Sequence, residues 1–512
     1  MTANAGNSDG TTTNAANGDD TTTTTTTTTN ANANANAANA GSSDGVTVVG
    51  GGLAGMTAAW TLRRLGLPVR LLEASAELGG MAGSREIDGR TEDHGVHIFP
   101  AWYRNTLRLA GDLGLTDNLR TTRKFHQLLP GPEFRTADTP AADRLLFLYG
   151  VLDLLAQDYR ARDESLHDFL RGRRYLSPAA VADIEHLFVA SSAAESTAVS
   201  AAGFRGSIAA FVRHPGRVRM PRGDLQHWFV GPFRQRLEAA GAEVLTGREL
   251  TAVTTDDHRV RTLTLRDPAG AETEEAVTGQ LVLAIPHGRL AALGPAITGA
   301  LRPAHGILEL TSRPLGALHL YLRRRLPGLP DEHIRLVGSP HAITLIDVGQ
   351  TWPGHRNSLL NCVVGRVAAL RHLADDEAVK ILVEELMSYL PGLDWEDIEH
   401  ICYQPHSSAP FHAPGPGSAR HRPRAFTAFA DLHLAGDFCA APAGVAGMEA
   451  AVRSGLVAAE SVRRRLRPEL PAVRVDPIGD VPPRLARLLR AALVPAVAAV
   501  RNRPRGNGSV RA

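Results

Sequence analysis

The chain of 512 residues has few cysteines, few aromatic side chains and almost no net charge. Its three cysteines, Cys362, Cys402 and Cys439, lie far apart and lack the spacing of a metal or redox motif, which favours a reduced cytosolic chain and predicts no metal site. A net charge of +2 gives no general surface for a polyanion and argues against nucleic acid as a partner. No run of 18 apolar residues occurs, so we expect no segment to span a membrane.

The first 45 residues are of low complexity, with consecutive threonines at 21–29 followed by alternating Ala and Asn. They lack the basic and apolar regions of a secretion signal. Because they cannot bury apolar area, we expect them to be disordered. The rest of the chain, with 43% hydrophobic residues overall, is too long for one ordinary core and predicts two or more lobes.

Residues 46–73 carry the most informative pattern: a β-branched strand, a glycine turn, an amphipathic helix and a second strand that ends in a carboxylate. Gly50 allows the tight turn, Gly52 allows backbone to approach a pyrophosphate, and Gly55 allows helix to pack on strand. The phosphates would lie at the helix N-terminus, and Glu73 would accept hydrogen bonds from a ribose. The predicted dinucleotide site comprises Gly50, Gly52, Leu53, Ala54, Gly55, Glu73 and Ala74.

Three further blocks indicate which dinucleotide is bound. A second glycine pair, Gly79 and Gly80, suits the long FAD molecule, which a second backbone segment must pass closely. The next block runs from Glu92 to Phe99, and a distant one runs from 433 to 453. Together the four blocks resemble the FAD-dependent amine oxidase and phytoene desaturase superfamily, above all its branch of carotenoid desaturases and hydroxysqualene dehydroxylases. That branch has an acidic residue, a Gly-x-His-x-Phe segment and an aromatic-x-Asn stretch, which here are Glu92, Gly95, His97, Phe99, Tyr103 and Asn105.

The resemblance, which spans residues 46–465, implies roles for individual positions. Gly79, Gly80, Met81 and Ala82 would pass the diphosphate, and Gly95, Val96 and His97 would approach the flavin ring. Val244 would present its backbone to the adenine, and Ala284 would lie at the end of the strand that closes the nucleotide lobe. Gly436 and Asp437 would hold the ribityl and phosphate region, and Gly447 and Met448 would open a helix facing the flavin C2 carbonyl. A helix N-terminus there would stabilise negative charge on the reduced ring.

The chain also departs from that family in two places. Met81 stands where a basic residue usually follows the second glycine pair, and Arg85 is the candidate to replace its phosphate contact. Residues 440–446 lack the aromatic that amine oxidases usually present beside the flavin. We therefore place amine oxidation below lipid oxidation.

His97 is the candidate catalytic residue, as a proton acceptor or an orienting donor. The alternative, that His97 is held by a hydrogen bond to backbone, is equally open. Hydride loss from an allylic C–H leaves a cation that its own double bonds stabilise, so strong acid–base residues are not required. The protein would mainly position the substrate and exclude water. Trp102 and Tyr103 are expected in the core, with the cavity wall as the alternative.

The predicted fold is α/β, a Rossmann-type FAD domain of the glutathione-reductase kind interleaved with an α+β substrate domain. We expect a loop at 125–140 and an all-apolar helix at 145–155. The domains are a disordered segment at 1–45, FAD-binding parts at 46–104, 224–299 and 431–465, a helical insert facing substrate or membrane at 105–223, a substrate domain with a mixed sheet at 300–430, and a basic Pro- and Arg-rich tail at 466–512. The tail helix has arginines at 484, 487 and 490 opposite leucines, which suits an interfacial membrane helix or a solvated one.

The leading hypothesis is therefore an FAD-dependent oxidoreductase that desaturates an isoprenoid or polyene lipid by hydride transfer to flavin N5. Alternatives are a hydroxysqualene dehydroxylase-type enzyme, a redox-neutral polyene isomerase, an amine or amino-acid oxidase, and a flavin-binding partner without turnover. The expected electron acceptor is a quinone or oxygen. We expect a cytoplasmic location, with peripheral contact to the inner face of the cell membrane as a further expectation.

Overall fold

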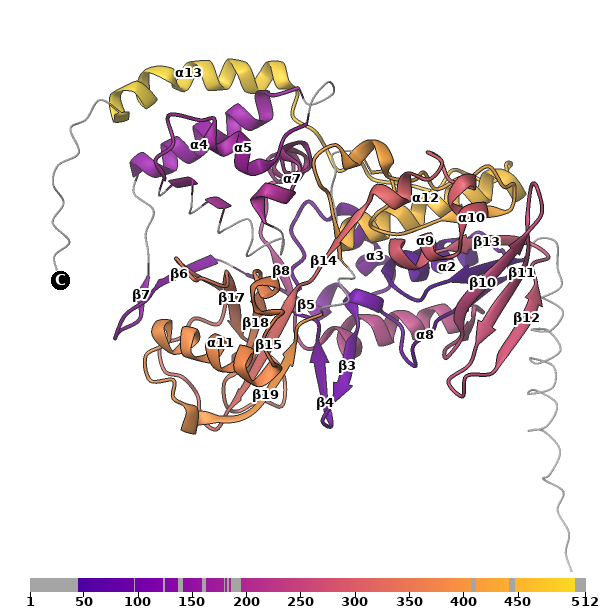
Figure 1. The fold of residues 1–512 in the computed structure, drawn as a ribbon, viewed down its shortest axis with the longest axis horizontal. Helices are drawn as coiled ribbons and strands as arrows, with labels where there is room; N and C mark the ends of the chain where they lie inside the picture. The colour runs from indigo at the N-terminus through magenta and orange to yellow at the C-terminus, as the bar shows by residue number, and fades with distance from the viewer. Residues whose placement is uncertain are drawn as a thin grey trace, which may run out of the picture.

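The computed structural model describes residues 45–501, apart from Val96, 123–124, 137–140, 159–162, Ala179, 182–183, 186–194, 407–410 and 442–446. Residues 1–44 of the predicted disordered segment, and Val96 of the predicted flavin site, therefore lie outside the described residues. The described residues form two lobes built on sheets, together with a group of helices beside them (Figure 1).

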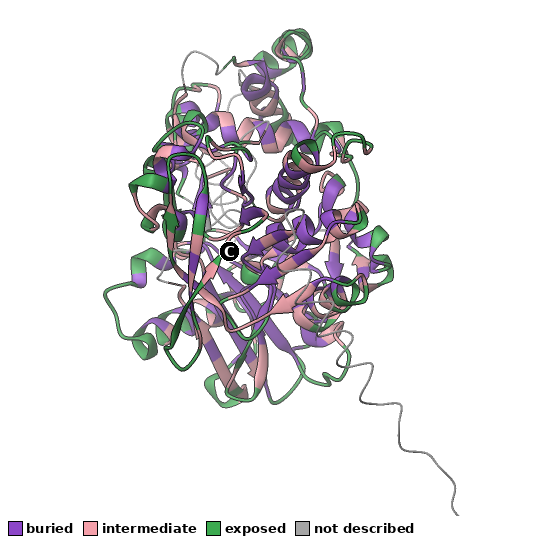
Figure 2. Cartoon of the chain, turned by 90° about the vertical axis from the view of Figure 1, so that its right-hand side faces the viewer, coloured by how far each residue is buried: buried purple, intermediate pink, exposed green. Residues whose placement is uncertain are grey.

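A parallel sheet of five short strands forms the centre of the first lobe, in the order β21–β13–β1–β2–β9. These strands are β1 (Val46–Val49), β2 (Val69–Leu72), β9 (Glu243–Leu245), β13 (Gln280–Leu283) and β21 (Leu432–Leu434). Side chains of the middle strands are buried on both faces, as expected for parallel strands rich in Val and Leu. Figure 2 shows this buried material in the strands and helices that cross the middle of the molecule.

Helices cover one face of this sheet and a second sheet covers the other. On the first face, α2 (Leu53–Arg64), α8 (Gly231–Ala239) and α12 (Met448–Leu466) share one core with β1 and β2. On the second face, the antiparallel strands β10 (Glu249–Thr255), β11 (Val260–Arg266) and β12 (Glu272–Ala276) share another, together with α9 (His287–Ala292) and α10 (Pro295–Ala300). The lobe is therefore assembled from three stretches of the chain, which is the interleaved Rossmann-type arrangement that the sequence predicts.

The second lobe is a mixed seven-stranded sheet in the order β19–β15–β18–β17–β16–β6–β7. Its strands are β6 (Phe125–Leu129), β7 (Arg135–Thr136), β15 (Gly316–Leu322), β16 (His333–Leu336), β17 (Ile343–Asp347), β18 (Leu359–Val364) and β19 (Ile398–Gln404). Helix α11 (Asp375–Tyr389) packs on one face. The prediction of a loop for 125–140 is wrong in part, because β6 pairs in parallel with β16 and extends this sheet.

The helical insert contains α4 (Ala141–Ala156), α5 (Leu166–Arg171) and α7 (Ala201–Arg213), and α13 (Pro483–Arg501) runs along α4 at the top of Figure 1. The segment before α13 packs against the rest of the protein. Its residues Asp476, Ile478 and Val481 are buried against α3 (Arg104–Asp112) and α7. Among the described residues, none of the helices combines the length and the apolar character needed to cross a bilayer.

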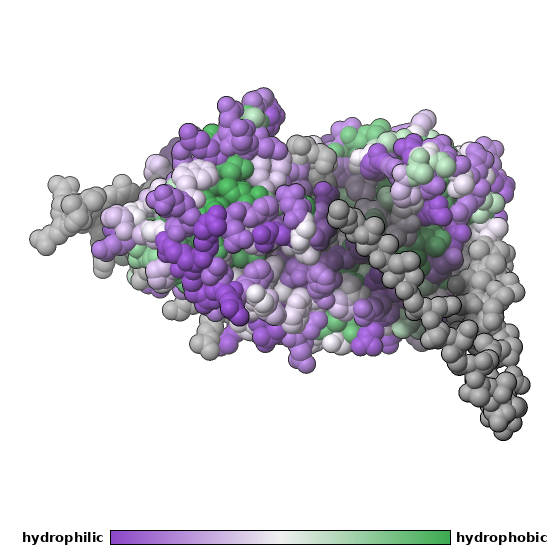
Figure 3. Space-filling model, turned by 90° about the horizontal axis from the view of Figure 1, so that it is seen from below, coloured by the Kyte–Doolittle hydropathy of each residue, from purple (hydrophilic) through white to green (hydrophobic). Residues whose placement is uncertain are grey.

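Smaller elements connect the lobes. The hairpin of β3 (Ser84–Ile87) and β4 (Arg90–Asp93) leaves the first lobe and reaches the second. Two more antiparallel strand pairs are β5 (Leu119–Thr121) with β8 (Arg219–Pro221) and β14 (Thr311–Arg313) with β20 (Phe411–Ala413). Seen from below in Figure 3, the surface is mostly hydrophilic, with apolar residues in separate patches.

Candidate active site

The first glycine loop lies between β1 and α2, and its glycines differ in what surrounds them. A Cβ on Gly50 would lie 2.4 Å from the carbonyl oxygen of Ala284, and one on Gly55 would lie 1.9 Å from that of Gly50. Backbone packing therefore requires glycine at both positions. At Gly52 the nearest atoms, in Gly79 and Gly80, would be 4.0 Å away. The space in front of Gly52 is thus left open by the protein, which fits the close approach of a diphosphate.

Helix α2 begins at Leu53, immediately after this loop, and its N-cap Gly52 provides no side-chain cap. The backbone N–H groups of Leu53, Ala54 and Gly55 belong to the first turn, which has no acceptor within the helix. Because the positive end of the helix dipole lies at the same point, this turn favours a bound anion. No acidic residue occupies the first turn.

Glu73 follows β2 and fixes the shape of the loop. Its Oε2 accepts a hydrogen bond from the Gly51 N–H at 2.6 Å, and its Oε1 accepts one from the Ser75 N–H at 2.8 Å. The exposed Ala74 lies beside it, and Val244 is placed next to β2 by the pairing of β2 with β9. The structure therefore brings Glu73, Ala74 and Val244 to the same edge of the sheet as the glycine loop.

The second glycine pair packs directly on the first loop. The Gly79 N–H donates to the Gly51 carbonyl at 2.8 Å, and a Cβ on Gly80 would lie 3.2 Å from the Cα of Gly52. Both residues have positive φ, +116° and +55°. Met81 and Ala82 continue as a short 3-10 helix. The backbone of the second glycine pair thus lies beside the open space at Gly52.

The distant C-terminal block reaches the same place. Strand β21 lies beside β13, and α12 crosses α2 so closely that a Cβ on Gly455 would lie 2.3 Å from the Ala54 carbonyl oxygen. After β21 comes Gly436, with φ +155°, whose N–H donates to Ser454 Oγ at 2.8 Å. The two sequence-distant segments therefore converge on one site.

Asp437 is half-buried at this turn, and its carboxylate accepts a hydrogen bond from the Gly447 N–H. Burial raises the pKa of Asp437 to about 6, although the nearby Arg422 lowers it. The Arg422 guanidinium is buried and donates to the carbonyls of Asp437 at 2.6 Å and Phe438 at 3.1 Å. The sequence analysis missed Arg422, because no motif surrounds it in the chain.

Met448 begins α12, and Gly447 before it has φ +84°. Glu449 is buried and accepts hydrogen bonds from the backbone N–H groups of Asn105 and Thr106, at 3.0 and 2.9 Å, and from both of their side chains. These bonds anchor the start of α12 to the start of α3, so Asn105 of the sequence motif has a holding role. Tyr103 is adjacent, with its hydroxyl 3.6 Å from where a Gly447 Cβ would be.

Gly95 lies at the contact between the two lobes, where a Cβ would be 3.2 Å from Cγ2 of Val363 on β18. His97 is half-buried and its Nε2 lies 3.2 Å from the Met81 carbonyl oxygen. In the tautomer that donates through Nε2, Nδ1 carries a lone pair, and this buried atom has no hydrogen-bond partner among the described residues. The bond to backbone is therefore present, and the catalytic role of His97 stays a prediction.

Neutral histidines line this contact. The rings of His94 and His406 have centroids 4.9 Å apart, and burial lowers the pKa of His94 to about 3 and that of His406 to about 4. Both rings are therefore uncharged at neutral pH. The predicted replacement for the missing basic residue, Arg85, is exposed on β3 and lowers the pKa of both histidines.

A cavity of about 630 Å³ adjoins the site near Arg422. It lies between α7, the start of α13 and the segment at 414–422, and its lining includes Arg205, Arg484 and Arg487. Arg205 pairs with Asp480 at 2.9 Å, and Arg487 donates to the Ala156 carbonyl at 3.2 Å. Of the predicted aromatic-free stretch 440–446, residues 442–446 lie outside the described residues.

The chain is similar in sequence and in fold to known flavin-dependent enzymes. A family model described as flavin containing amine oxidoreductase matches residues 53–463. The chain is 24% identical over 465 residues to the 15-cis-phytoene desaturase of an Oncidium hybrid cultivar, covering 81% of this chain and 77% of the relative. It is 23% identical over 469 residues to that of Synechococcus elongatus, covering 82% and 96%. The cyclohexylamine oxidase structure from Brevibacterium oxydans superposes with a TM-score of 0.64 at 15% identity, covering 83% and 100%.

Proposed function

The chain belongs to the flavin containing amine oxidoreductase family, and on that premise we propose that it desaturates an isoprenoid or polyene lipid. That it is an FAD-dependent oxidoreductase follows from the family. The proposed substrate class rests on the relatives of similar length, which are phytoene desaturases and align over 81% and 82% of this chain. The observation that carries the cofactor assignment is the open space at Gly52. This space lies beside the backbone of Gly79 and Gly80, and a side chain at position 52 would enter it.

The residues at the site fit FAD. The first turn of α2 would bind the diphosphate, Glu73 would accept from the adenosine ribose, and Asp437 would accept from the ribityl chain. The start of α12 at Met448 would present N–H groups and the positive end of its dipole to the ring. Bound FAD supplies a two-electron acceptor for hydride.

Desaturation removes a hydride and a proton from neighbouring carbons of the substrate and leaves a new double bond. The cation formed by hydride loss is delocalised over the existing double bonds, so the protein need only hold the chain and exclude water. The proton needs an acceptor, and the lone pair on His97 Nδ1 is available because Nε2 is bonded to Met81. The two electrons would pass on to a quinone or to oxygen.

Contact with a membrane would give this enzyme access to its substrate, and α13 carries the surface for it. Arg487 and Arg490 bond to Ala156 and Asp153 of α4, although the rest of the Arg487 side chain is exposed. Leu485, Leu488 and Leu489 are exposed, at 48%, 70% and 49%. A helix that carries exposed leucines beside exposed arginines suits a membrane interface, and we therefore favour the interfacial interpretation.

A test of the function follows the flavin absorbance of the full-length chain under anaerobic conditions. We expect a phytoene-like polyene in detergent micelles to bleach the flavin, and primary amines to leave it oxidised. Bleaching by amines alone would replace the desaturase proposal with an amine oxidase. Bleaching by neither, with product formed only from chemically reduced enzyme, would favour the dehydroxylase or isomerase alternatives. A yellow protein inert to all of them would favour the binding partner.

The same experiment examines His97. His97→Ala should keep its flavin, because the hydrogen bond that the ring makes among the described residues is to the Met81 carbonyl, and should bleach at least about tenfold more slowly. An unchanged rate would limit His97 to a structural role.

A further inference from the structure

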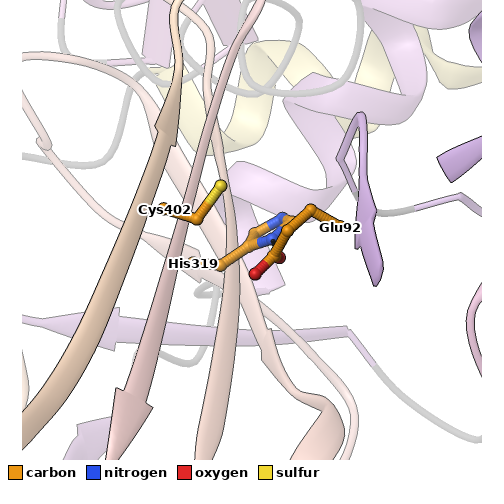
Figure 4. Close-up of side chains that lie close together, drawn as sticks. All are labelled: Glu92, His319 and Cys402. Atoms are coloured by element: carbon orange, nitrogen blue, oxygen red, sulfur yellow. Dashed lines mark hydrogen bonds and ion pairs between the residues drawn. The ribbon is translucent and has the colours of Figure 1, made fainter. Parts of the chain in front are cut away.

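Three buried side chains from both lobes meet at the foot of the β3–β4 hairpin: Glu92 on β4, His319 on β15 and Cys402 on β19 (Figure 4). One ligand atom of each lies within 4.8 Å of those of the other two. The residues are 1%, 2% and 4% exposed, respectively, so water does not compete for these atoms.

The register of the second sheet explains the cluster. His319 is directly opposite Cys402 in the antiparallel pair of β15 and β19, so both side chains lie on the same face. Their neighbours Leu318 and Leu320 belong to the core under α11, on the other face. The hairpin then brings Glu92 against the polar face. Because 227 residues separate Glu92 from His319 and 83 separate His319 from Cys402, no spacing motif announces the cluster in the sequence.

The hydrogen bonds of the cluster leave capacity for a ligand. Glu92 accepts from His319 Nδ1 and, at 2.8 Å, from the Tyr321 hydroxyl. His319 Nε2 is buried and has no hydrogen-bond partner among the described residues. The Cys402 sulfur has a weak contact at 3.8 Å with the Gln404 amide. Glu92 is bonded to Nδ1, on the other side of the ring, so an ion shared by Glu92 and His319 would bind Nδ1 in place of this hydrogen bond, and the ring hydrogen would then reside on Nε2.

We propose that Glu92, His319 and Cys402 bind one Zn²⁺ ion. Carboxylate, imidazole and thiolate are all zinc ligands, and three protein ligands leave one coordination position open. The carboxylate and the thiolate together balance the charge of a divalent cation. Tyr321 and Gln404 would orient two of the ligands from outside, as partners of metal ligands commonly do.

Binding would exchange the thiol proton for the metal. Without metal, burial raises the pKa of Cys402 to about 12, so the sulfur stays protonated. Zinc binds the thiolate and releases this proton, and no electron is transferred. The ion would cross-link the two lobes through Glu92, three residues before Gly95, where the lobes are in contact.

The experiment uses the full-length chain purified without a metal-chelating resin. We expect elemental analysis to find about one zinc per chain. Replacement of zinc by Co²⁺ should give a thiolate-to-cobalt charge-transfer band in the near ultraviolet. Cys402→Ser should lose the band, and Glu92→Gln should weaken Co²⁺ binding at least about tenfold. The matched control is Cys362→Ser: Cys362 is equally buried on the neighbouring β18 but belongs to the core under α11, and this variant should keep the metal.

A wild-type chain that binds neither Zn²⁺ nor Co²⁺ saturably would overturn the proposal, and so would a Cys402→Ser variant that keeps the band. The wild-type spectrum decides even if a variant fails to fold. Flavin absorbance in the same samples separates this proposal from the proposed function. A yellow chain without metal contradicts only the zinc site, and a colourless chain with zinc contradicts only the flavin enzyme.

Discussion

In this site, one glycine is needed for folding and another for cofactor binding, so the two requirements can be tested by separate substitutions. A Cβ at Gly55 would collide with the Gly50 carbonyl at 1.9 Å, whereas one at Gly52 would have 4.0 Å of clearance from the protein. We therefore expect Gly52→Ala to fold normally and to lose most of its FAD, because the added methyl enters the space kept for the diphosphate. Gly55→Ala, as its counterpart, should unfold at lower temperature. Thermal melting and flavin content measure the two effects.

If Gly52→Ala binds FAD as tightly as the wild type, the diphosphate does not pass in front of this residue.

The same loop shows which site residues the sequence could predict. The spacing of the glycines and Glu73 predicted their placement because a strand–turn–helix motif of this kind has a fixed spacing along the chain. Arg422 gave no signal, since its contacts are with carbonyls 15 and 16 residues further along, which only the folded chain brings near.

At the scale of elements, α13 presents the sharpest test. Leu488 is 70% exposed, so Leu488→Glu should leave the fold intact. We expect the wild type to float with phosphatidylcholine–phosphatidylglycerol vesicles and the variant to stay in the soluble fraction, because a charge replaces an inserted leucine. Salt should weaken wild-type binding only modestly, since Arg487 and Arg490 bond to the protein.

Leu308→Glu is the matched control, because Leu308 is 58% exposed on the segment at 306–309, outside α13. Flotation that survives Leu488→Glu would mean that α13 contacts no membrane.

Elements with regular patterns, such as α11 and β15, were predictable from the sequence. Strand β6 was not: its partner β16 lies about 200 residues away, and its polar surroundings in the sequence resemble a loop.

At the scale of the whole molecule, the sequence predicted that two distant segments of the chain would form one site, and in the structure α12 packs closely on α2. It could not predict the polar contact between the lobes. That contact depends on which face of β15 meets the β3–β4 hairpin, and alternation along a strand does not say which partner each face receives. Glu92, His319 and Cys402 therefore came together without any sign in the sequence.

Buried acids and buried histidines give the molecule opposing pH dependences. Burial lowers the pKa of His433 to about 4, so the unfolded chain binds the extra proton between about pH 4 and 6.5. Burial raises the pKa of Asp347, so there the folded chain holds the extra proton as pH rises above about 3.8. His433 therefore makes the folded state less stable as the pH falls from about 6.5 to about 4. Asp347 makes the folded state less stable as the pH rises above about 3.8.

We therefore expect the two classes to be separable by single substitutions. When the protein is denatured near pH 5, His433→Gln should take up fewer protons than the wild type, by up to about one. Asp347→Asn should take up more, because burial raises the pKa of Asp347 and the wild type therefore releases protons from this carboxyl when it unfolds. Potentiometric measurement of proton uptake on denaturation gives both numbers without requiring reversible unfolding. Changes of the same sign in the two variants would contradict a lowered pKa for His433 and a raised pKa for Asp347 in the fold.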